Sequence, residues 1–234
     1  SSMGFDALIP ALNSGNIDVA IAGMSITDER KKVVVFSDPY YTSGLIVMVK
    51  KDDDTIKGFS DLEGKRIAVQ IGTTGANKAG EVKNAKVTAF NDNTAAAMEL
   101  KNGGADAVLI DNIMAEIYCK QNSDLQYESV PSTAEDTVFC IEKGNTELVQ
   151  IINDGLAKVK KSGEYDDLYQ KYFVDTLENS EDVTDVAATH GFLGLLSFIF
   201  LQDNRWKFYI NGLGITLIVS LLSVTVGILI GLVV

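Results

Sequence analysis

The residues with the clearest potential for chemistry lie between Asp18 and Arg30. Asp18–Ala22 consists mainly of small and branched apolar residues, which are typical of a short buried strand. A Gly-x-Ser turn at Gly23 and Ser25 is expected next, and then a Thr-x-x-Arg turn that opens a short helix. A planar guanidinium beside free amides and a hydroxyl binds a carboxylate through two parallel hydrogen bonds. Arg30 is therefore a candidate carboxylate-binding residue, and the alternative is a surface arginine that closes a helical turn.

A second candidate site is the turn Gly72-Thr73-Thr74-Gly75, which follows a predicted strand and precedes a predicted helix. Such a turn directs free backbone amides and the positive end of the helix dipole toward an anion. It lacks the Lys-Ser/Thr of a nucleotide-binding P-loop, so phosphate transfer is not predicted. The alternative is that the threonines only cap the helix.

Asp111 adds a negative charge at the carboxyl end of the predicted strand 107–110. Ligands of open α/β sheets bind at that end of the strands, and an ionised carboxylate there suits an ammonium group. The alternative is that Asp111 only caps the helix that follows. With Arg30 on one lobe and Thr73, Thr74 and Asp111 on the other, the sequence predicts a receptor for a zwitterion, with its carboxylate at Arg30 and its ammonium at Asp111.

The elements that would position these residues alternate between strand and helix from residue 58 onward. Strands predicted at 66–70, 86–90 and 107–110 are separated by helices, which indicates a parallel sheet with helices on both faces. The other predicted elements are helices at 5–13, 59–62, 94–100 (capped by Asn93), 112–120, 147–161 and 164–173, and strands at 33–36, 44–49, 125–130 and 136–141.

Composition places the chain among globular proteins and excludes some function classes. It has 234 residues, of which 46% are apolar and 22% charged. A net charge of −12 argues against binding nucleic acid. His190 is the only histidine, so no cluster has metal-ligand spacing, and no metal or cofactor is predicted. Whether Cys119 and Cys140 form a disulfide stays open at this stage.

The predicted organisation is a split lobe, an inserted lobe and a membrane anchor. Residues 1–47 and 143–174 are expected to form lobe 1, without its N-terminal part, and residues 48–142 lobe 2, with crossings near 45–49 and 138–142. Residues 175–190 are acidic and predict a linker. The uncharged run 208–234 is long enough to span a bilayer, and Arg205, Trp206, Lys207 and Tyr209 precede it as an interfacial belt. Both ends are expected to continue into a longer protein.

Several of these motifs resemble the polar amino acid-binding proteins of ABC importers, which include glutamine- and histidine-binding proteins. The resemblance covers residues 5–173 and implies an α/β, two-lobed periplasmic-binding-protein (type 2) fold with doubly wound sheets, followed by a transmembrane helix. It implies binding of a polar L-amino acid and no enzymatic activity. The motifs that carry it are Asp18–Arg30, Phe36–Tyr41 (Phe-Ser-Asp-Pro-Tyr-Tyr), Gly44–Lys50 (Gly-Leu-Ile-Val-Met-Val-Lys), Gly64–Thr74 and Ala105–Asp111.

The same resemblance implies roles for individual residues. The ligand's carboxylate would be held by Arg30, Ser25 and the turn of Gly72, Thr73 and Thr74. Its ammonium would be held by Gly23, Ser25 and Asp111. Gln70 stands where glutamine-binding proteins have a lysine, so the resemblance does not extend to glutamine specificity. The family's first strand and its stacking aromatic residue would precede Ser1.

Residues 211–217 (Asn-Gly-Leu-Gly-Ile-Thr-Leu) and the apolar run after them resemble the first transmembrane helix of an amino acid ABC permease. This implies that residues 191–234 begin a permease domain in the same chain, which would work with a cytoplasmic ATP-binding subunit. The protein is then expected in the cell membrane, with its binding domain on the extracytoplasmic side.

Two other function classes compete with this interpretation. An enzyme similar to cyclohexadienyl dehydratase would need a general acid or base in the cleft, and no buried histidine or spare pair of carboxylates is predicted. The main alternative is the ligand-sensing domain of a membrane receptor, either a histidine kinase or a glutamate-receptor-like channel. A channel would carry its pore near residues 50–58, where only a short charged loop is expected, and a kinase would follow Val234.

Overall fold

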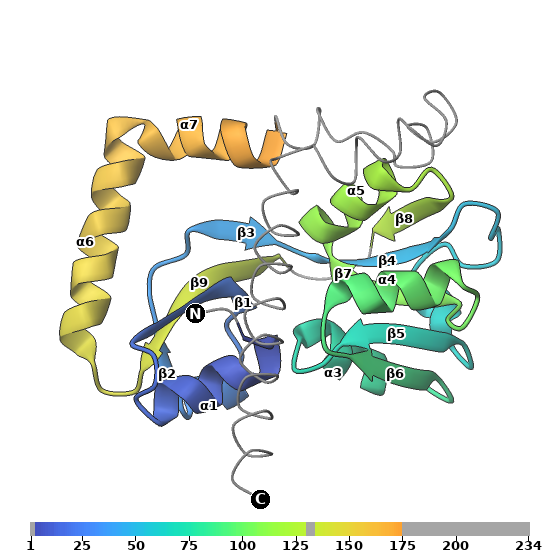
Figure 1. Cartoon of the computed structure of the whole chain (residues 1–234), viewed down its shortest axis with the longest axis horizontal. Helices are drawn as coiled ribbons and strands as arrows, with labels where there is room; N and C mark the ends of the chain where they lie inside the picture. Colours follow the sequence, from blue (N-terminus) through green and yellow to red (C-terminus); the bar gives the residue numbers. More distant parts are fainter. Residues whose placement is uncertain (1–2, 130–133, 175–234) are drawn as a thin grey trace, which may run out of the picture. The chain divides into compact units, whose positions relative to one another are not determined.

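The computed structural model describes residues 3–129 and 134–174, and its strands form two sheets, one in each of two lobes (Figure 1). This confirms the predicted two-lobed α/β fold. The first lobe's sheet contains β1 (Val19–Ser25), β2 (Val34–Phe36), β3 (Tyr41–Ser43) and β9 (Glu135–Glu142). The second lobe's sheet has the order β6 (Lys86–Phe90), β5 (Arg66–Gln70), β7 (Ala107–Asp111), β4 (Leu45–Lys50), β8 (Leu125–Ser129).

The helices follow the predicted pattern closely. They are η1 (Phe5–Ala7), α1 (Leu8–Asn13), α2 (Asp28–Lys31), η2 (Phe59–Leu62), α3 (Thr74–Gly80), α4 (Asn93–Lys101), α5 (Asn112–Gln121), α6 (Thr146–Ser162), α7 (Glu164–Tyr169) and the π-helical turn η3 (Gln170–Val174). One cap differs, because Asp92 rather than Asn93 accepts the hydrogen bond that starts α4, from the backbone N–H of Ala95 at 2.8 Å.

The second lobe's sheet is mixed, whereas the sequence predicted a parallel one. β5 pairs in parallel with β6 and with β7, as expected, but β4 is antiparallel to both β7 and β8. The chain enters this lobe along β4, before the alternation of strand and helix begins, so no helical crossover sets the direction of β4. Helices do cover both faces. Val47 and Val49 pack on one side with Ile67 and Leu109, and Ile46 and Met48 pack on the other, which explains the unbroken apolar run of β4.

In the first lobe, β9 is the central strand and pairs antiparallel with β1, β2 and β3. The predicted Gly-x-Ser turn is corrected here, because β1 continues through Ser25. The register of β1 against β9 shifts between Ala20 and Met24, and Gly23 within this irregularity has φ +54°. A glycine adopts this left-handed conformation without steric cost, so it makes a bulge in the strand rather than a turn.

The chain passes from one sheet to the other slightly earlier in the sequence than predicted, at both crossings. Residues 45–49 already belong to the second lobe's sheet, and residues 138–142 lie in β9 of the first lobe's sheet. The change from one sheet to the other falls at Gly44. Its N–H donates to Asn112 Oδ1 at 3.2 Å, and its carbonyl accepts from Asn112 N at 2.9 Å. The division into lobes at 47/48 and 142/143 stays a prediction, while this contact ties the crossing to the start of α5.

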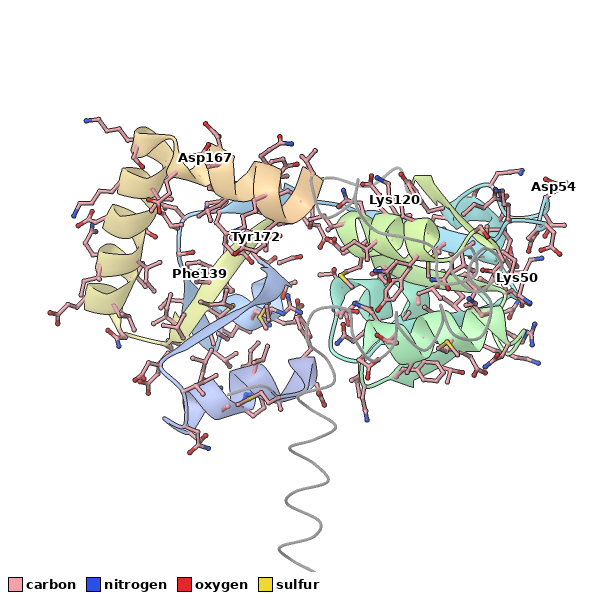
Figure 2. The ribbon with its side chains drawn as sticks, turned by 45° about the horizontal axis from the view of Figure 1, so that its top comes forward. Lys50, Asp54, Lys120, Phe139, Asp167 and Tyr172 are labelled. Atoms are coloured by element: carbon pink, nitrogen blue, oxygen red, sulfur yellow. The ribbon has the colours of Figure 1, made fainter. Side chains whose placement is uncertain are left out.

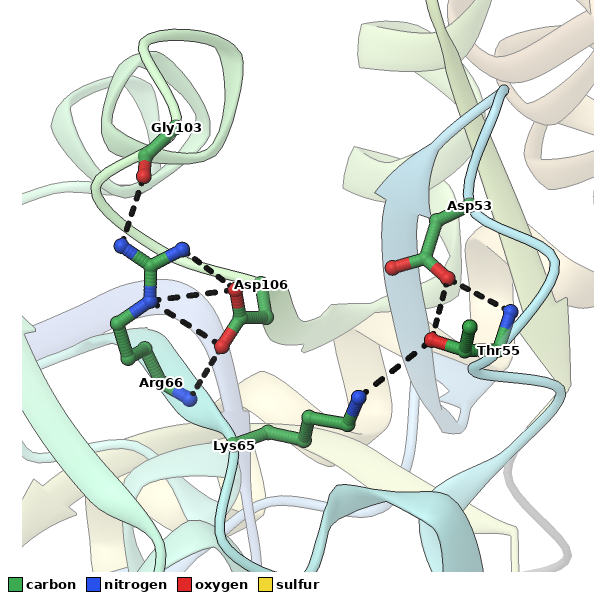
Figure 3. A network of polar contacts seen from close by, with 6 residues as sticks. All are labelled: Asp53, Thr55, Lys65, Arg66, Gly103 and Asp106. Carbon is green, nitrogen blue, oxygen red and sulfur yellow. Dashed lines mark hydrogen bonds and ion pairs between the residues drawn. The ribbon is translucent and has the colours of Figure 1, made fainter.

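A charged network holds the edge of the second lobe at the amino ends of β5 and β7 (Figure 3). Arg66 forms a bidentate ion pair with Asp106, at 2.5 Å from Nη2 and 3.2 Å from Nε, and donates to Gly103 O at 2.8 Å. The hydrogen bond from Arg66 lowers the pKa of the Asp106 carboxyl. Asp111 lies at the opposite end of β7, so we assign the Arg66–Asp106 pair to the stability of the sheet.

Both cysteines are free thiols, which answers the open question about a disulfide. Cys140 lies in the core of the first lobe, where its Sγ contacts Met24 Sδ at 3.1 Å, whereas Cys119 packs against a core of the second lobe. Burial raises the pKa of the Cys140 thiol to about 11 and that of Cys119 to about 12. Neither thiol is therefore prone to form a reactive thiolate at neutral pH.

Aromatic rings gather where the first lobe meets the last helices. Tyr41 stacks on Phe173 with ring centroids 5.3 Å apart, and Phe173 stacks on Tyr169 at 5.1 Å. Phe139 packs against Tyr40 at 4.7 Å, and Figure 2 shows it on the same lobe as Tyr172. These contacts attach α7 and η3 to β3.

Of the helices in residues 3–129 and 134–174, none is both long and apolar enough to cross a membrane. The predicted spanning run 208–234, the linker 175–190 and the segment 191–234 all lie outside the described residues.

Candidate ligand-binding cleft

A cavity of about 360 Å³ receives side chains from both lobes, and we refer to it as the cleft. The structure brings seven of the eight predicted site residues to its walls: Gly23, Ser25 and Arg30 from the first lobe, and Gln70, Thr73, Thr74 and Asp111 from the second. The eighth, Gly72, does not line the cleft itself, but its carbonyl accepts a hydrogen bond from Arg30, which does. Their contact with a ligand stays a prediction. The volume falls within the range of small-molecule sites.

Arg30 is buried at the end of a well-capped turn. Thr27 caps α2, and its Oγ1 accepts from the Arg30 backbone N–H at 3.2 Å. The guanidinium donates to Ser25 O at 2.6 Å and to Gly72 O at 2.8 Å, and lies 5.5 Å from the centroid of the Phe5 ring. Arg30 is only 8% exposed, and burial lowers its pKa. Within the described residues it has no ion pair, so a buried cation stands beside the cleft with donors left for an anion.

In the glycine-threonine turn of the second lobe, the hydroxyls of Thr73 and Thr74 make different contacts. Thr73 caps α3, since its Oγ1 accepts from Ala76 N at 3.1 Å and donates to Gln70 O at 2.8 Å. The capping alternative therefore holds for Thr73. Thr74 Oγ1 instead donates across to Glu135 Oε2 at 2.8 Å. The turn needs Gly72, whose φ is +77°.

Asp111 combines the two roles that the sequence left open. It caps α5, with Oδ1 accepting from Ile113 N at 2.9 Å, and it also lines the cleft. Burial raises the pKa of the Asp111 carboxyl. The Ser43 hydroxyl near this carboxyl lowers its pKa, but by less than burial raises it. A partly desolvated carboxylate in a cleft favours a cationic group as its partner.

Gln70 lies at the carboxyl end of β5, where its Nε2 donates to Asn91 O at 3.2 Å. On the opposite side, Tyr40, Tyr41 and Phe173 give the cleft an aromatic wall. The two tyrosines belong to the Phe-Ser-Asp-Pro-Tyr-Tyr motif, but nothing in the motif indicates that the Tyr41 ring stacks on Phe173, 132 positions later.

Glu135 is a further cleft residue that the sequence does not indicate. Its Oε2 accepts from Ser25 Oγ at 2.6 Å and from Thr74 Oγ1 at 2.8 Å. The sequence does not indicate this second carboxylate, which lines the cleft together with Asp111. In the part of the chain that the structure describes, no group of histidine, cysteine or acidic residues could hold a metal ion.

The sequence of residues 1–175 matches the model of one protein family, the bacterial extracellular solute-binding proteins, family 3. The chain belongs to this family. A probable histidine-binding protein of Campylobacter jejuni is 38% identical over 170 residues, which cover 72% of this chain and 66% of that protein. The arginine-binding extracellular protein ArtP of Bacillus subtilis is 36% identical over 176 residues, with 73% and 69% covered.

Among solved structures, an ancestral arginine-binding protein bound to arginine has a TM-score of 0.71 and 44% identity, covering 74% of this chain and 79% of that one. These relatives of the family 3 protein are amino acid-binding proteins rather than enzymes. The chain spans about two thirds of the length of the curated relatives that it matches first.

Proposed function

We propose that this family 3 protein binds a polar L-amino acid in the cleft and delivers it to an ABC importer. The observation that carries the proposal is the pairing of opposite charges across the cleft, with the buried guanidinium of Arg30 on the first lobe and the carboxylate of Asp111 on the second. The names of the relatives, which include histidine- and arginine-binding proteins, support the ligand class.

In this proposal the backbone groups of the ligand connect the lobes. Arg30, Ser25 and the turn of Gly72, Thr73 and Thr74 hold its carboxylate. Gly23, Ser25 and Asp111 hold its ammonium. A ligand that contacts both lobes binds the closed form better than the open one and shifts the population toward it. Gln70 and the aromatic wall face the ligand's side chain and set the order of preference among amino acids.

Titration calorimetry of the full chain with the twenty L-amino acids tests this function. We expect a polar amino acid to bind most tightly. The decarboxylated and the deaminated analogue of that amino acid should each bind at least about 30-fold more weakly, because each leaves one buried charge in the cleft without its partner. Tight binding of a sugar, a metal ion or a peptide in place of amino acids would contradict the proposal.

We also propose that residues 191–234 begin a permease domain that anchors the binding lobes on the outer side of the cell membrane. The support is the uncharged run 208–234 and the interfacial belt of Arg205, Trp206, Lys207 and Tyr209. When the full chain is expressed in bacteria, we expect it in the membrane fraction and resistant to extraction by high salt. A chain ending at Val174 should appear in the soluble fraction. Recovery of both chains in the soluble fraction would refute the anchor.

A further inference from the structure

Glu135 connects the two lobes through a single carboxylate oxygen. It stands at the start of β9, and its Oε2 accepts from Ser25 Oγ on the first lobe at 2.6 Å and from Thr74 Oγ1 on the second at 2.8 Å. Ser25 is only 7% exposed, and all three residues line the cleft. Hydrogen bonds from hydroxyls to an ionised carboxylate are among the stronger ones in proteins, and these two distances are short.

The two hydroxyls are also the ones proposed to bind a ligand's carboxylate. A serine or threonine hydroxyl has one proton to donate. Both protons point to Glu135, so neither is left for a second acceptor. Two carboxylates at the same donors also repel each other. An amino acid can therefore use Ser25 and Thr74 for its carboxylate only after Glu135 has moved away.

We propose that Glu135 is a tethered carboxylate that joins the lobes through Ser25 and Thr74 and competes with the carboxylate of an incoming amino acid for these hydroxyls. This inference rests on the proposed function. Its consequence is that the measured affinity is lower than the intrinsic affinity of the cleft, because only the fraction of molecules with Glu135 displaced is ready to bind. Glu135 is thus a residue that sets affinity through the ligand's carboxylate and is indifferent to its side chain.

The test compares L-arginine with agmatine, which has the same guanidinium side chain but no carboxylate. Only arginine has a carboxylate that must displace Glu135. The ratio of the two affinities therefore reports this competition and cancels any effect of a variant on binding of the ligand's guanidinium side chain. We expect Glu135→Gln to raise the arginine-to-agmatine ratio about tenfold or more, and Glu135→Ala to raise it further. A glutamine keeps a neutral, weaker acceptor for the two hydroxyls, whereas an alanine has none.

Asp136→Asn is the matched control, because it removes the same charge from the next residue of β9. The Asp136 side chain is exposed and accepts from Thr42 Oγ1 at 3.2 Å, outside the cleft. The arginine-to-agmatine affinity ratio of Asp136→Asn should equal that of the unmodified protein. An unchanged ratio in both Glu135 variants would overturn the proposal. Weaker binding of arginine and agmatine alike would also overturn it, because Glu135 would then hold the ligand's ammonium.

Small-angle X-ray scattering without added amino acid measures the connection between lobes separately. We expect a larger radius of gyration for Glu135→Ala than for the unmodified protein and for Asp136→Asn. An equal radius would show that Glu135 does not keep the lobes together and that the hydrogen bond from Arg30 to Gly72 O is sufficient. If no amino acid bound to any of the proteins, the proposed function and the proposed competition would both fail. The scattering comparison would still show whether Glu135 joins the lobes.

Discussion

Replacing Asp111 with asparagine is expected to weaken amino acid binding by about 2–5 kcal/mol and, at neutral pH, to raise the free energy of unfolding. The loss of affinity follows from removing the carboxylate that pairs with the ligand's ammonium in a partly buried cleft. Asparagine keeps the size of the side chain and is an equally good cap, so the hydrogen bond from Ile113 N to start α5 is retained. The two effects separate binding from folding.

The sign of the stability change follows from the pKa shift. Burial raises the pKa of Asp111 above its ordinary value of 3.8, so the folded protein holds this proton more tightly than the unfolded chain. The contribution of this group to stability therefore falls as the pH rises from the ordinary pKa through the raised one. Above that window the ionised carboxylate destabilises the folded protein, and asparagine removes this cost.

Thermal unfolding without added ligand, at a series of pH values, measures the effect. The advantage of Asp111→Asn over the unmodified protein should be largest at neutral pH and should shrink as the pH falls through the window. Asp106→Asn is the control, at the opposite end of β7. Arg66 lowers the pKa of Asp106, so this carboxylate stabilises the folded protein above its ordinary pKa. Asp106→Asn should lose stability and keep its affinity. Normal binding by Asp111→Asn would place the ammonium site elsewhere.

The local elements could be predicted from the sequence wherever nearby residues determine them. The bounds 66–70 of β5, 86–90 of β6 and 59–62 of η2 agree with the structure, because apolar runs, glycines and caps mark them within a few residues. The direction of β4 was not predictable in this way. It depends on which lobe the chain leaves, and the apolar run 45–49 is the same in a parallel and an antiparallel sheet.

The cleft residues likewise divide into those marked by nearby sequence and those brought together only by the fold. Arg30, Thr74 and Asp111 are predictable as site residues because Asp111 ends a strand and the other two follow one within five residues, where open α/β sheets bind ligands. The sequence around Gly23 predicts a turn, because a glycine with positive φ suits a turn and a bulge alike, and only the register with β9 distinguishes them. Glu135 has no local signal. Its partners are 110 and 61 residues away in sequence, so only the assembled lobes reveal its contacts.

Arg30→Lys is expected to lower the affinity for every amino acid by about 2 kcal/mol or more. In the structure one guanidinium reaches the carbonyls of Ser25 and Gly72 on opposite lobes and keeps further N–H groups for an anion. A lysine ammonium concentrates three donors at one point and has no planar fork. It cannot maintain both carbonyl contacts and also bind a carboxylate through two parallel hydrogen bonds.

The loss should be the same for histidine, arginine and glutamine, because it concerns the carboxylate that all amino acids share. Gln70→Ala, in contrast, should change the order of preference among them. Arg66→Lys provides the same chemical change at an arginine far from the cleft, where it should weaken the ion pair with Asp106 and leave affinity unaltered. Titration of the three variants with the three amino acids separates these outcomes. If Arg30→Lys bound like the unmodified protein while Arg66→Lys did not, the carboxylate site would have to lie outside this cleft.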